Sequence, residues 1–166
     1  MKWIGIILII LAGGAAGFFQ SRNLSERVRL LEQTKSLIKS LENSIRYQAV
    51  PLNELISRIS NQSCPYYLKY CSAQLKQGRP FPAAWEKALT SPDCKCYLKQ
   101  DDISLLQLFG KGLGISDIEG QVSHCELYFS MLEEKYQNAK EEQEKKGRLY
   151  FMLGILSGLG VALIIL

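Results

Sequence analysis

The chain has 166 residues, 47% of them hydrophobic, and a formal net charge of +4 at pH 7. All sixteen acidic residues and all but one of the twenty Lys and Arg residues lie between two uncharged end segments, where the signs are evenly mixed. The middle lacks the clustered basic stripe typical of nucleic-acid-binding proteins, so nucleic acid is not an expected partner. It is long enough for one domain with a modest core and too short for two.

The first predicted element is an N-terminal transmembrane helix over residues 1–20. Residues 3–19, WIGIILIILAGGAAGFF, are uncharged and long enough to span a bilayer. Lys2 followed by an apolar core and small residues is also typical of a cleavable signal peptide, which would place the middle of the chain outside the cytoplasm. The arginines from Arg22 to Arg29 favour the first interpretation, because basic residues on the inner flank of a span indicate a cytoplasmic middle.

A long amphipathic helix is expected to follow this span. Asn23 and Glu26 have the spacing of a capping box. The apolar positions that follow are Leu24, Val28, Leu31, Ile38, Leu41 and Ile45, with Thr34 filling the gap. The helix should end near Val50, because Pro51 disfavours helical geometry in the residue before it.

Three or four short helices are predicted next. They are expected at residues 51–59, 65–77, 83–89 and 103–109. The segment from Thr90 to Lys95, which contains Pro92, is expected to be a polar turn. Asp101 and Asp102 suit the N-terminus of the last short helix, where negative charge is favourable, and the glycines at 110, 112 and 114 should end it.

The last predicted helix runs from Ser116 to Leu166. Ser116 and Glu119 have the spacing of a capping box. Apolar residues then recur at spacings of three and four, namely Val122, Cys125, Phe129, Leu132, Tyr136 and Ala139. From Leu149 the chain carries no charge, and this run reaches roughly 27 Å as a helix, close to the thickness of a bilayer core.

The predicted fold class is all-α. Residues 21–148 should form a cytoplasmic helical bundle of about six helices, whose first and last helices continue into transmembrane helices at 1–20 and 149–166. No stretch alternates as a strand would. Because the two long helices leave the same membrane face, we expect them to lie side by side, with the short helices closing the bundle at the end away from the membrane.

The sequence offers little for chemistry, so no catalytic residue, cofactor or metal is expected. His124 adjoins Cys125 on a helix, where neighbouring side chains do not face each other, and it is expected to be a surface or boundary residue. Cys94 and Cys96 form a CxC pair without the second pair of a metal site. They leave a membrane-anchored redox or metal-sensing protein as the alternative function. The odd count of five cysteines indicates reduced thiols.

Small residues recur four apart in both predicted spans. Gly13 and Gly17 do so in the first span, and Gly154, Gly158 and Ala162 in the second. Such faces let helices approach closely in lipid, which predicts packing of the spans on each other or on another subunit. Glycine is also simply common in membrane helices, and this second explanation stays open.

Three segments carry a recognisable pattern. They are LIKSLENSIRYQAVPLNELISRIS (37–60), LFGKGLGISDIEGQ (108–121) and RLYFMLGILSGLGVALIIL (148–166). The most specific positions are Tyr47, Pro51 and Leu52 in the first and Leu113, Gly114, Ser116, Asp117 and Gln121 in the second. Together with the short N-terminal span, these segments make the whole chain resemble the stage III sporulation protein AB family of endospore-forming bacteria.

This resemblance implies a non-enzymatic membrane platform component of the channel apparatus between mother cell and forespore. The family's cytoplasmic domain is similar to the platform protein of type II secretion and type IV pilus systems. By that similarity, the chain is expected to be a multi-pass protein of the mother-cell membrane around the forespore and to dock a cytoplasmic ATPase of the same sporulation operon. Its other expected partners are membrane subunits of the channel and the lipid bilayer, and the sequence is compatible with a homo-oligomer.

Overall fold

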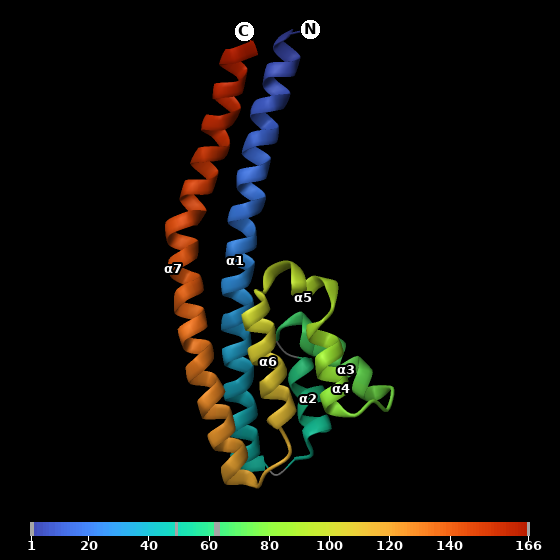
Figure 1. Ribbon diagram of the computed structural model, residues 1–166. Coiled ribbons are helices and arrows are strands. Elements are labelled where there is room, and N and C mark those ends of the chain that lie inside the picture. The colour runs from blue at the N-terminus through green and yellow to red at the C-terminus, as the bar shows by residue number, and fades with distance from the viewer. Residues whose placement is uncertain (1, 49, 62–63, 166) are drawn as a thin grey trace. The chain divides into compact units, whose positions relative to one another are not determined.

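The computed structural model describes residues 2–48, 50–61 and 64–165, and every regular element in these ranges is a helix. The side chains of residues 2–18, 20, 93, 95–96, 147–148, 150–151, 154–155 and 157–165 lie outside this description. The helices are α1 (Lys2–Gln48), α2 (Leu52–Ser60), α3 (Tyr66–Lys76), α4 (Phe81–Leu89), α5 (Pro92–Tyr97), α6 (Gln100–Gly112) and α7 (Ile118–Ile165) (Figure 1). The predicted all-α class is confirmed.

The chain divides into two structural units. One comprises residues 1–28 and 137–166, and the other comprises residues 29–136. The second unit therefore contains all five short helices and the adjoining ends of α1 and α7. The three predicted domains, with boundaries after residues 20 and 148, stay a prediction.

In the first unit, α1 and α7 pair through polar contacts next to a buried alanine. Arg27 Nη1 lies 3.2 Å from Glu142 Oε2, and both side chains are largely shielded from solvent. Gln143 donates a hydrogen bond from Nε2 to Ser25 Oγ at 2.9 Å, and Ala139 is buried. The small alanine lets the helices approach closely enough for these long side chains to meet.

The two transmembrane helices stay predictions. Among the residues that the structure describes, no helix combines the length and the apolar character needed to cross a membrane. Gly13, Gly17, Gly154, Gly158 and Ala162, which were expected to pack the spans, lie outside the residues whose surroundings are described.

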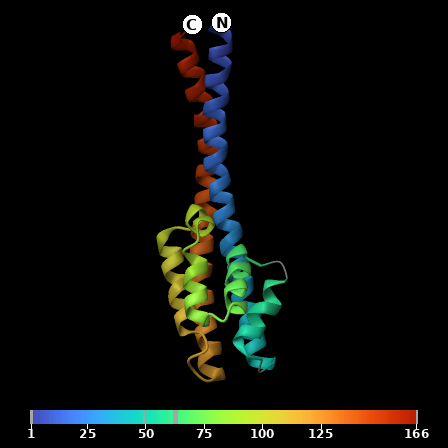
Figure 2. The same cartoon turned by 90° about the vertical axis from the view of Figure 1, so that its right-hand side faces the viewer.

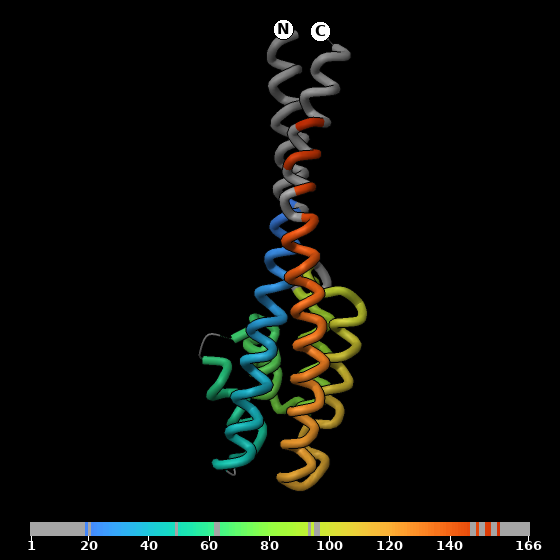
Figure 3. The backbone as a smooth tube through the Cα atoms, turned by 90° about the vertical axis from the view of Figure 1, so that its left-hand side faces the viewer, coloured from blue at the N-terminus to red at the C-terminus, as the bar shows by residue number. Residues whose placement is uncertain are grey.

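The second unit has two layers of helices. The end of α1 and the start of α7 lie side by side, as Figures 1 and 3 show. In the other layer α3 contacts α2 and α4, and α4 contacts α6, so α2, α3, α4 and α6 follow one another across it (Figure 2). The expectation that the short helices close the end of the bundle is wrong. Each has an apolar face to bury, and burial requires them to lie along the long helices.

The core of the second unit is centred on Trp85 of α4. Its side chain is 1% exposed, and its Nε1 donates a hydrogen bond to the Leu106 carbonyl oxygen of α6 at 2.7 Å. Its ring meets Tyr67 of α3 edge-on, with centroids 5.6 Å apart, and Phe109 of α6 at 6.0 Å. Such edge-to-face pairs add to the stabilisation from apolar burial. One side chain thus joins three short helices.

Thr34, the one polar residue in the apolar series of α1, has a structural role. Its side chain is buried, and Oγ1 lies 2.7 Å from both the Leu30 carbonyl oxygen and the Tyr67 hydroxyl. A buried hydroxyl without a partner would cost about 1–3 kcal/mol, so Thr34 makes the burial of Tyr67 tolerable. Burial also raises the pKa of Tyr67, so its hydroxyl stays neutral and able to donate. This contact ties the short-helix layer to α1.

Two predicted capping boxes are wrong. Helix α1 runs without a break through Asn23 and Glu26, since no proline or glycine interrupts the helix around them. At the start of α7 the cap is Asp117, whose Oδ1 accepts a hydrogen bond from the Gly120 N–H at 2.9 Å. The predicted cap, Ser116, lies one residue too early, because Asp117 is the better-placed acceptor for the first turn.

The predicted polar turn at residues 90–95 is also wrong in part. Pro92 begins the short helix α5, where proline is favoured because its missing N–H needs no partner. The prediction for the next helix is confirmed, since Asp101 and Asp102 lie in the first turn of α6. Asp102 Oδ2 accepts a hydrogen bond from the Lys99 N–H at 3.0 Å, which fixes the entry into this helix.

Gly110→Ala is expected to lower the free energy of unfolding by about 2 kcal/mol. A Cβ atom at this position would lie 2.1 Å from Trp85 Cδ1, and such overpacking costs about 1–3 kcal/mol. Displacing the indole also weakens its hydrogen bond to Leu106, worth about 1 kcal/mol, whereas the better helix propensity of alanine gains only about 1 kcal/mol. Urea unfolding followed by far-ultraviolet circular dichroism measures the change.

The control is Ser104→Ala at an exposed position of the same helix. It is expected to stay within about 0.5 kcal/mol of the parent protein. A Gly110→Ala protein as stable as this control would show that the Trp85 ring does not need the space left by the missing side chain of Gly110.

Candidate functional site

One end of the second unit is formed by the two connections α1–α2 and α6–α7, which lie next to each other. A groove of about 290 Å³ runs between them. It is lined by Ile45, Val50, Pro51, Leu52, Leu55, Gly114, Ile118 and Gln121. The structure therefore brings together the two groups of positions that carry the family pattern, around Pro51 and around Gly114. No pattern in the sequence indicates that these two connections lie close together.

Seven of the exposed residues at this end form what we call the junction surface. They are Arg46, Tyr47, Pro51, Ile115, Asp117, Ile118 and Glu119. The surface belongs wholly to the second unit.

The shape of the junction surface follows from the backbone chemistry of its two connections. Pro51 ends α1 and begins α2, and its carbonyl oxygen accepts hydrogen bonds from the N–H groups of Glu54 and Leu55 at 3.0 and 3.1 Å. Gly114 has a φ of +83°, which residues with a side chain rarely adopt. In the second connection, Gln121 Nε2 donates to the Ser116 carbonyl oxygen at 2.9 Å. Several positions of the family pattern thus hold the two connections in place.

Large apolar side chains are unusually exposed on the junction surface. Tyr47 is 79% exposed, Ile115 78% and Ile118 54%, whereas the neighbouring Leu113 is only 3% exposed. Grouped apolar side chains of this kind mark sites of protein interaction more often than chance. The exposure of two of these side chains could have been predicted from the sequence. Tyr47 falls outside the apolar series of α1, and Ile115 lies in a connection between helices.

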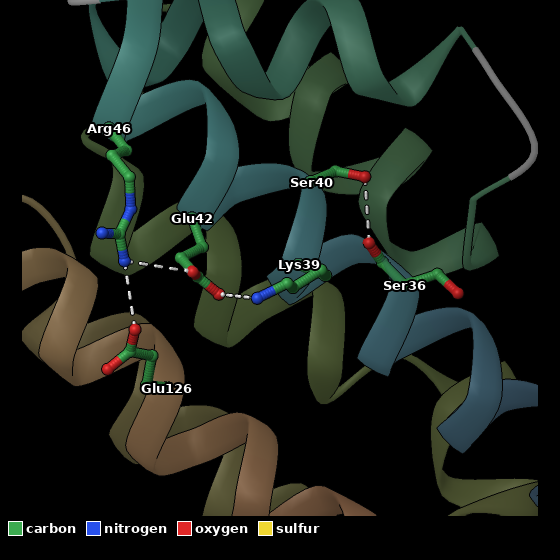
Figure 4. Close-up of polar contacts among 6 residues, drawn as sticks. All are labelled: Ser36, Lys39, Ser40, Glu42, Arg46 and Glu126. Atoms are coloured by element: carbon green, nitrogen blue, oxygen red, sulfur yellow. Dashed lines mark hydrogen bonds and ion pairs between the residues drawn. The ribbon is translucent and has the colours of Figure 1, made fainter.

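A charge network links α1 to α7 beside these apolar residues (Figure 4). The buried Glu42 carboxylate lies 2.8 Å from Lys39 Nζ and 3.4 Å from Arg46 Nη2. Arg46 also reaches across to Glu126 at 3.1 Å. Exposed ion pairs contribute about 0–1 kcal/mol, so the network sets the position of Arg46 more than it stabilises the fold.

A second, shallow groove extends the junction surface along this network. Its volume is about 530 Å³. It is lined by Arg46, Ile118, Glu119, Val122, Ser123 and Glu126. Apolar and charged groups are therefore adjacent at this end, an arrangement that suits a protein partner with an apolar centre and a polar rim.

His124 and Cys125 do not act together. The half-buried His124 ring stacks on Phe109, with centroids 5.4 Å apart, and its Nε2 lies 2.9 Å from the Phe109 carbonyl oxygen. Burial, followed by the nearby carboxylates of Glu42 and Glu126, raises the pKa of Cys125 to about 12. His124 thus packs as the expected boundary residue, and Cys125 stays a thiol at neutral pH.

The cysteines give no support to redox or metal chemistry. Cys94 is buried in α5, and the side chain of Cys96 lies outside the described residues. Burial raises the pKa of Cys71 to about 12 and also raises the pKa of Cys64. In the described part of the chain, no three His, Cys, Asp or Glu side chains come together in a way that could hold a metal ion. Cys64, Cys71 and Cys125 therefore lack the lowered pKa of a reactive cysteine.

Comparison with known proteins gives one consistent answer. The family model for stage III sporulation protein AB matches residues 2–166. Stage III sporulation protein AB of Bacillus subtilis (strain 168) is 30% identical over 170 residues, which covers 100% of this chain and 99% of that protein. A solved structure of a stage III sporulation protein AB is similar with a TM-score of 0.62 and 29% identity, covering 72% of this chain and 98% of that chain. The resemblance found in the sequence is confirmed.

Ile115→Asp is expected to leave the free energy of unfolding within about 0.5 kcal/mol of the parent value, because the side chain is already in water. Leu113→Asp, two residues earlier, should destabilise by about 3 kcal/mol or more, because it buries a charge without a partner. Urea unfolding of both proteins measures the difference. Equal destabilisation would mean that Ile115 is packed and not available to a partner.

Proposed function

Since the chain belongs to the stage III sporulation protein AB family and therefore acts in sporulation, we propose that it is a non-enzymatic membrane platform of the channel apparatus between mother cell and forespore. Its ends anchor it in the mother-cell membrane around the forespore, and its middle lies in the cytoplasm. There it docks a cytoplasmic ATPase of the same operon. The anchoring segments bind other membrane subunits of the channel through their small residues.

Several features of the end segments support membrane anchoring. Both are uncharged, and basic residues flank each of them on the side of the middle domain. Large apolar side chains are exposed where these segments begin, including Phe19, Leu149, Met152 and Leu156. Such side chains in water would be unfavourable, whereas lipid accommodates them.

The junction surface is the observation that carries the docking proposal. Ile118 lines both grooves, Arg46 and Glu119 line the second, and the exposed Tyr47 and Ile115 lie in the chain segments next to these lining residues. A few residues, most often Trp, Tyr and Arg, supply most of the binding energy at a protein interface, while the charged rim selects the partner. Because the family pattern builds this surface, we assign the ATPase contact to it.

Ile115→Asp is expected to lower retention of the ATPase about tenfold when the full chain is purified from sporulating cells, because a desolvated carboxylate opposes apolar contact. Leu108→Asp is the matched control, since Leu108 is 55% exposed on α6 away from the junction surface. Quantitative mass spectrometry of the retained proteins gives the ratio. Unchanged retention in Ile115→Asp, or equal loss in both proteins, would contradict the assigned surface.

The proposed orientation predicts that the full chain stays with the membranes of sporulating cells after an alkaline carbonate wash. For the orientation, the full chain is expressed in non-sporulating cells, where it inserts in the outer cell membrane: protease added to intact protoplasts should leave residues 21–148 uncut and should cut them after lysis, because the middle lies in the cytoplasm. Immunoblotting of the fragments provides the measurement. Cleavage of the middle in intact protoplasts would instead favour the signal-peptide interpretation.

A further inference from the structure

Positive charge is concentrated in the part of the second unit that runs from α3 to the start of α6. Residues 64–99 hold six of the twenty Lys and Arg residues and two of the sixteen acidic ones, an excess equal to the net charge of the whole chain. Helices α3 and α4 together carry one acidic residue, Glu86. A field of one sign on one part of a protein attracts partners of the other sign.

The cations of α3 and α4 also differ from several cations of the long helices in their pairing. On the long helices Lys35 pairs with Glu133 and Arg46 pairs with Glu126. The cations on α3, α4 and their connection are Lys69, Lys76, Arg79 and Lys87, and all four are exposed. Among the described residues, none of these four forms an ion pair. Among the described side chains, their charge is therefore not neutralised by an ion pair.

An apolar groove lies among these cations, between α3 and the end of α4. Its volume is about 550 Å³, and Tyr66, Tyr70, Lys87, Thr90, Ser91 and Pro92 line it. Tyr66 and Tyr70 are one helical turn apart, so their rings lie on the same side of α3. Tyr70 is 40% exposed. Aromatic and proline rings beside a single cation suit an extended peptide with an apolar anchor and a negative charge.

A second groove, which is basic, lies on the adjacent stripe of α3. Its volume is about 380 Å³, and Ser60, Asn61, Lys69, Ser72, Ala73 and Lys76 line it. Lys69 follows Tyr66 by three residues, which places the two grooves on neighbouring stripes of one helix. A segment crossing α3 would meet Lys87 in one groove and Lys69 and Lys76 in the other.

We propose that this α3–α4 face docks an acidic segment of a partner protein, with one apolar side chain of that segment in the groove of Tyr66, Tyr70 and Pro92. The carboxylates of the segment pair with Lys87 in that groove and with Lys69 and Lys76 in the other. This inference goes beyond the proposed function, because it adds a docking surface separate from the junction surface.

Two other anionic partners fit the face less well. Nucleic acid is bound by a continuous basic track with stacked bases, whereas Lys87 is the one cation among the described residues that line the groove between α3 and α4. A lipid surface would pair with exposed lysines but would place no side chain in a 550 Å³ groove. The combination of apolar walls and surrounding cations favours a peptide.

The test places a photo-crosslinker at the groove, as Tyr70→p-benzoylphenylalanine in the full chain within sporulating cells. We expect irradiation to yield a protein adduct whose crosslinked peptide, mapped by mass spectrometry, has more acidic than basic residues. Adding Lys87→Glu should lower the adduct yield about tenfold, because attraction becomes repulsion. Lys87→Arg keeps the charge and should restore the yield, which separates loss of binding from misfolding.

The matched control is Lys140→Glu, the same charge reversal at an exposed position of α7 outside this face. It should leave the yield unchanged. No adduct, an adduct with a neutral or basic peptide, with lipid or with nucleic acid, or equal loss in Lys87→Glu and Lys140→Glu would each overturn the proposal. ATPase retention measured in the same cells should be unaffected by Lys87→Glu, so failure here is distinguishable from failure of the junction surface.

Discussion

The hydrogen bond from the Trp85 indole to the Leu106 carbonyl oxygen is the contact on which the short-helix layer depends. Because Gly110 has no Cβ atom, the indole ring occupies the space that a side chain would fill there and comes close enough to reach this oxygen. With the indole seated there, α4 lies against α6 and brings Tyr67 of α3 beside it. Tyr67 then reaches Thr34 of α1. A chain of contacts thus runs from α6 to α1 through one tryptophan.

The periodicity of the sequence was enough to predict the class of the fold and most of its core. Leu31, Ile38 and Leu41 of α1 are buried as their spacing predicts, and so are Val122 and Leu132 of α7. These predictions succeed because a helix repeats its apolar face at a fixed interval. Local capping was harder to predict, because Ser116 and Asp117 are both good caps and only the path of the connection selects Asp117.

The candidate site could not be predicted in the same way. Pro51 and Gly114 are recognisable as turn residues, but no local rule says that turns this far apart in sequence meet. Their proximity follows from the pairing of α1 with α7 and from α6 packing beside them, which depend on many contacts at once. The basic face on α3 and α4 was missed because its lysines look evenly spread in the sequence. They stand out once the ion pairs of the long helices show which cations remain unneutralised.

The buried thiols allow the opening of the two helical layers to be measured separately. Cys71 in α3 and Cys125 in α7 are fully buried and have a pKa of about 12, whereas Cys64 is partly exposed. A thiol reagent therefore reaches Cys71 or Cys125 only when the helix that carries the cysteine opens. The rate of modification then reports how often each layer opens. These two native side chains, one in each layer, would show whether a docked partner slows the opening of one layer or of both. No label site has to be added to the chain.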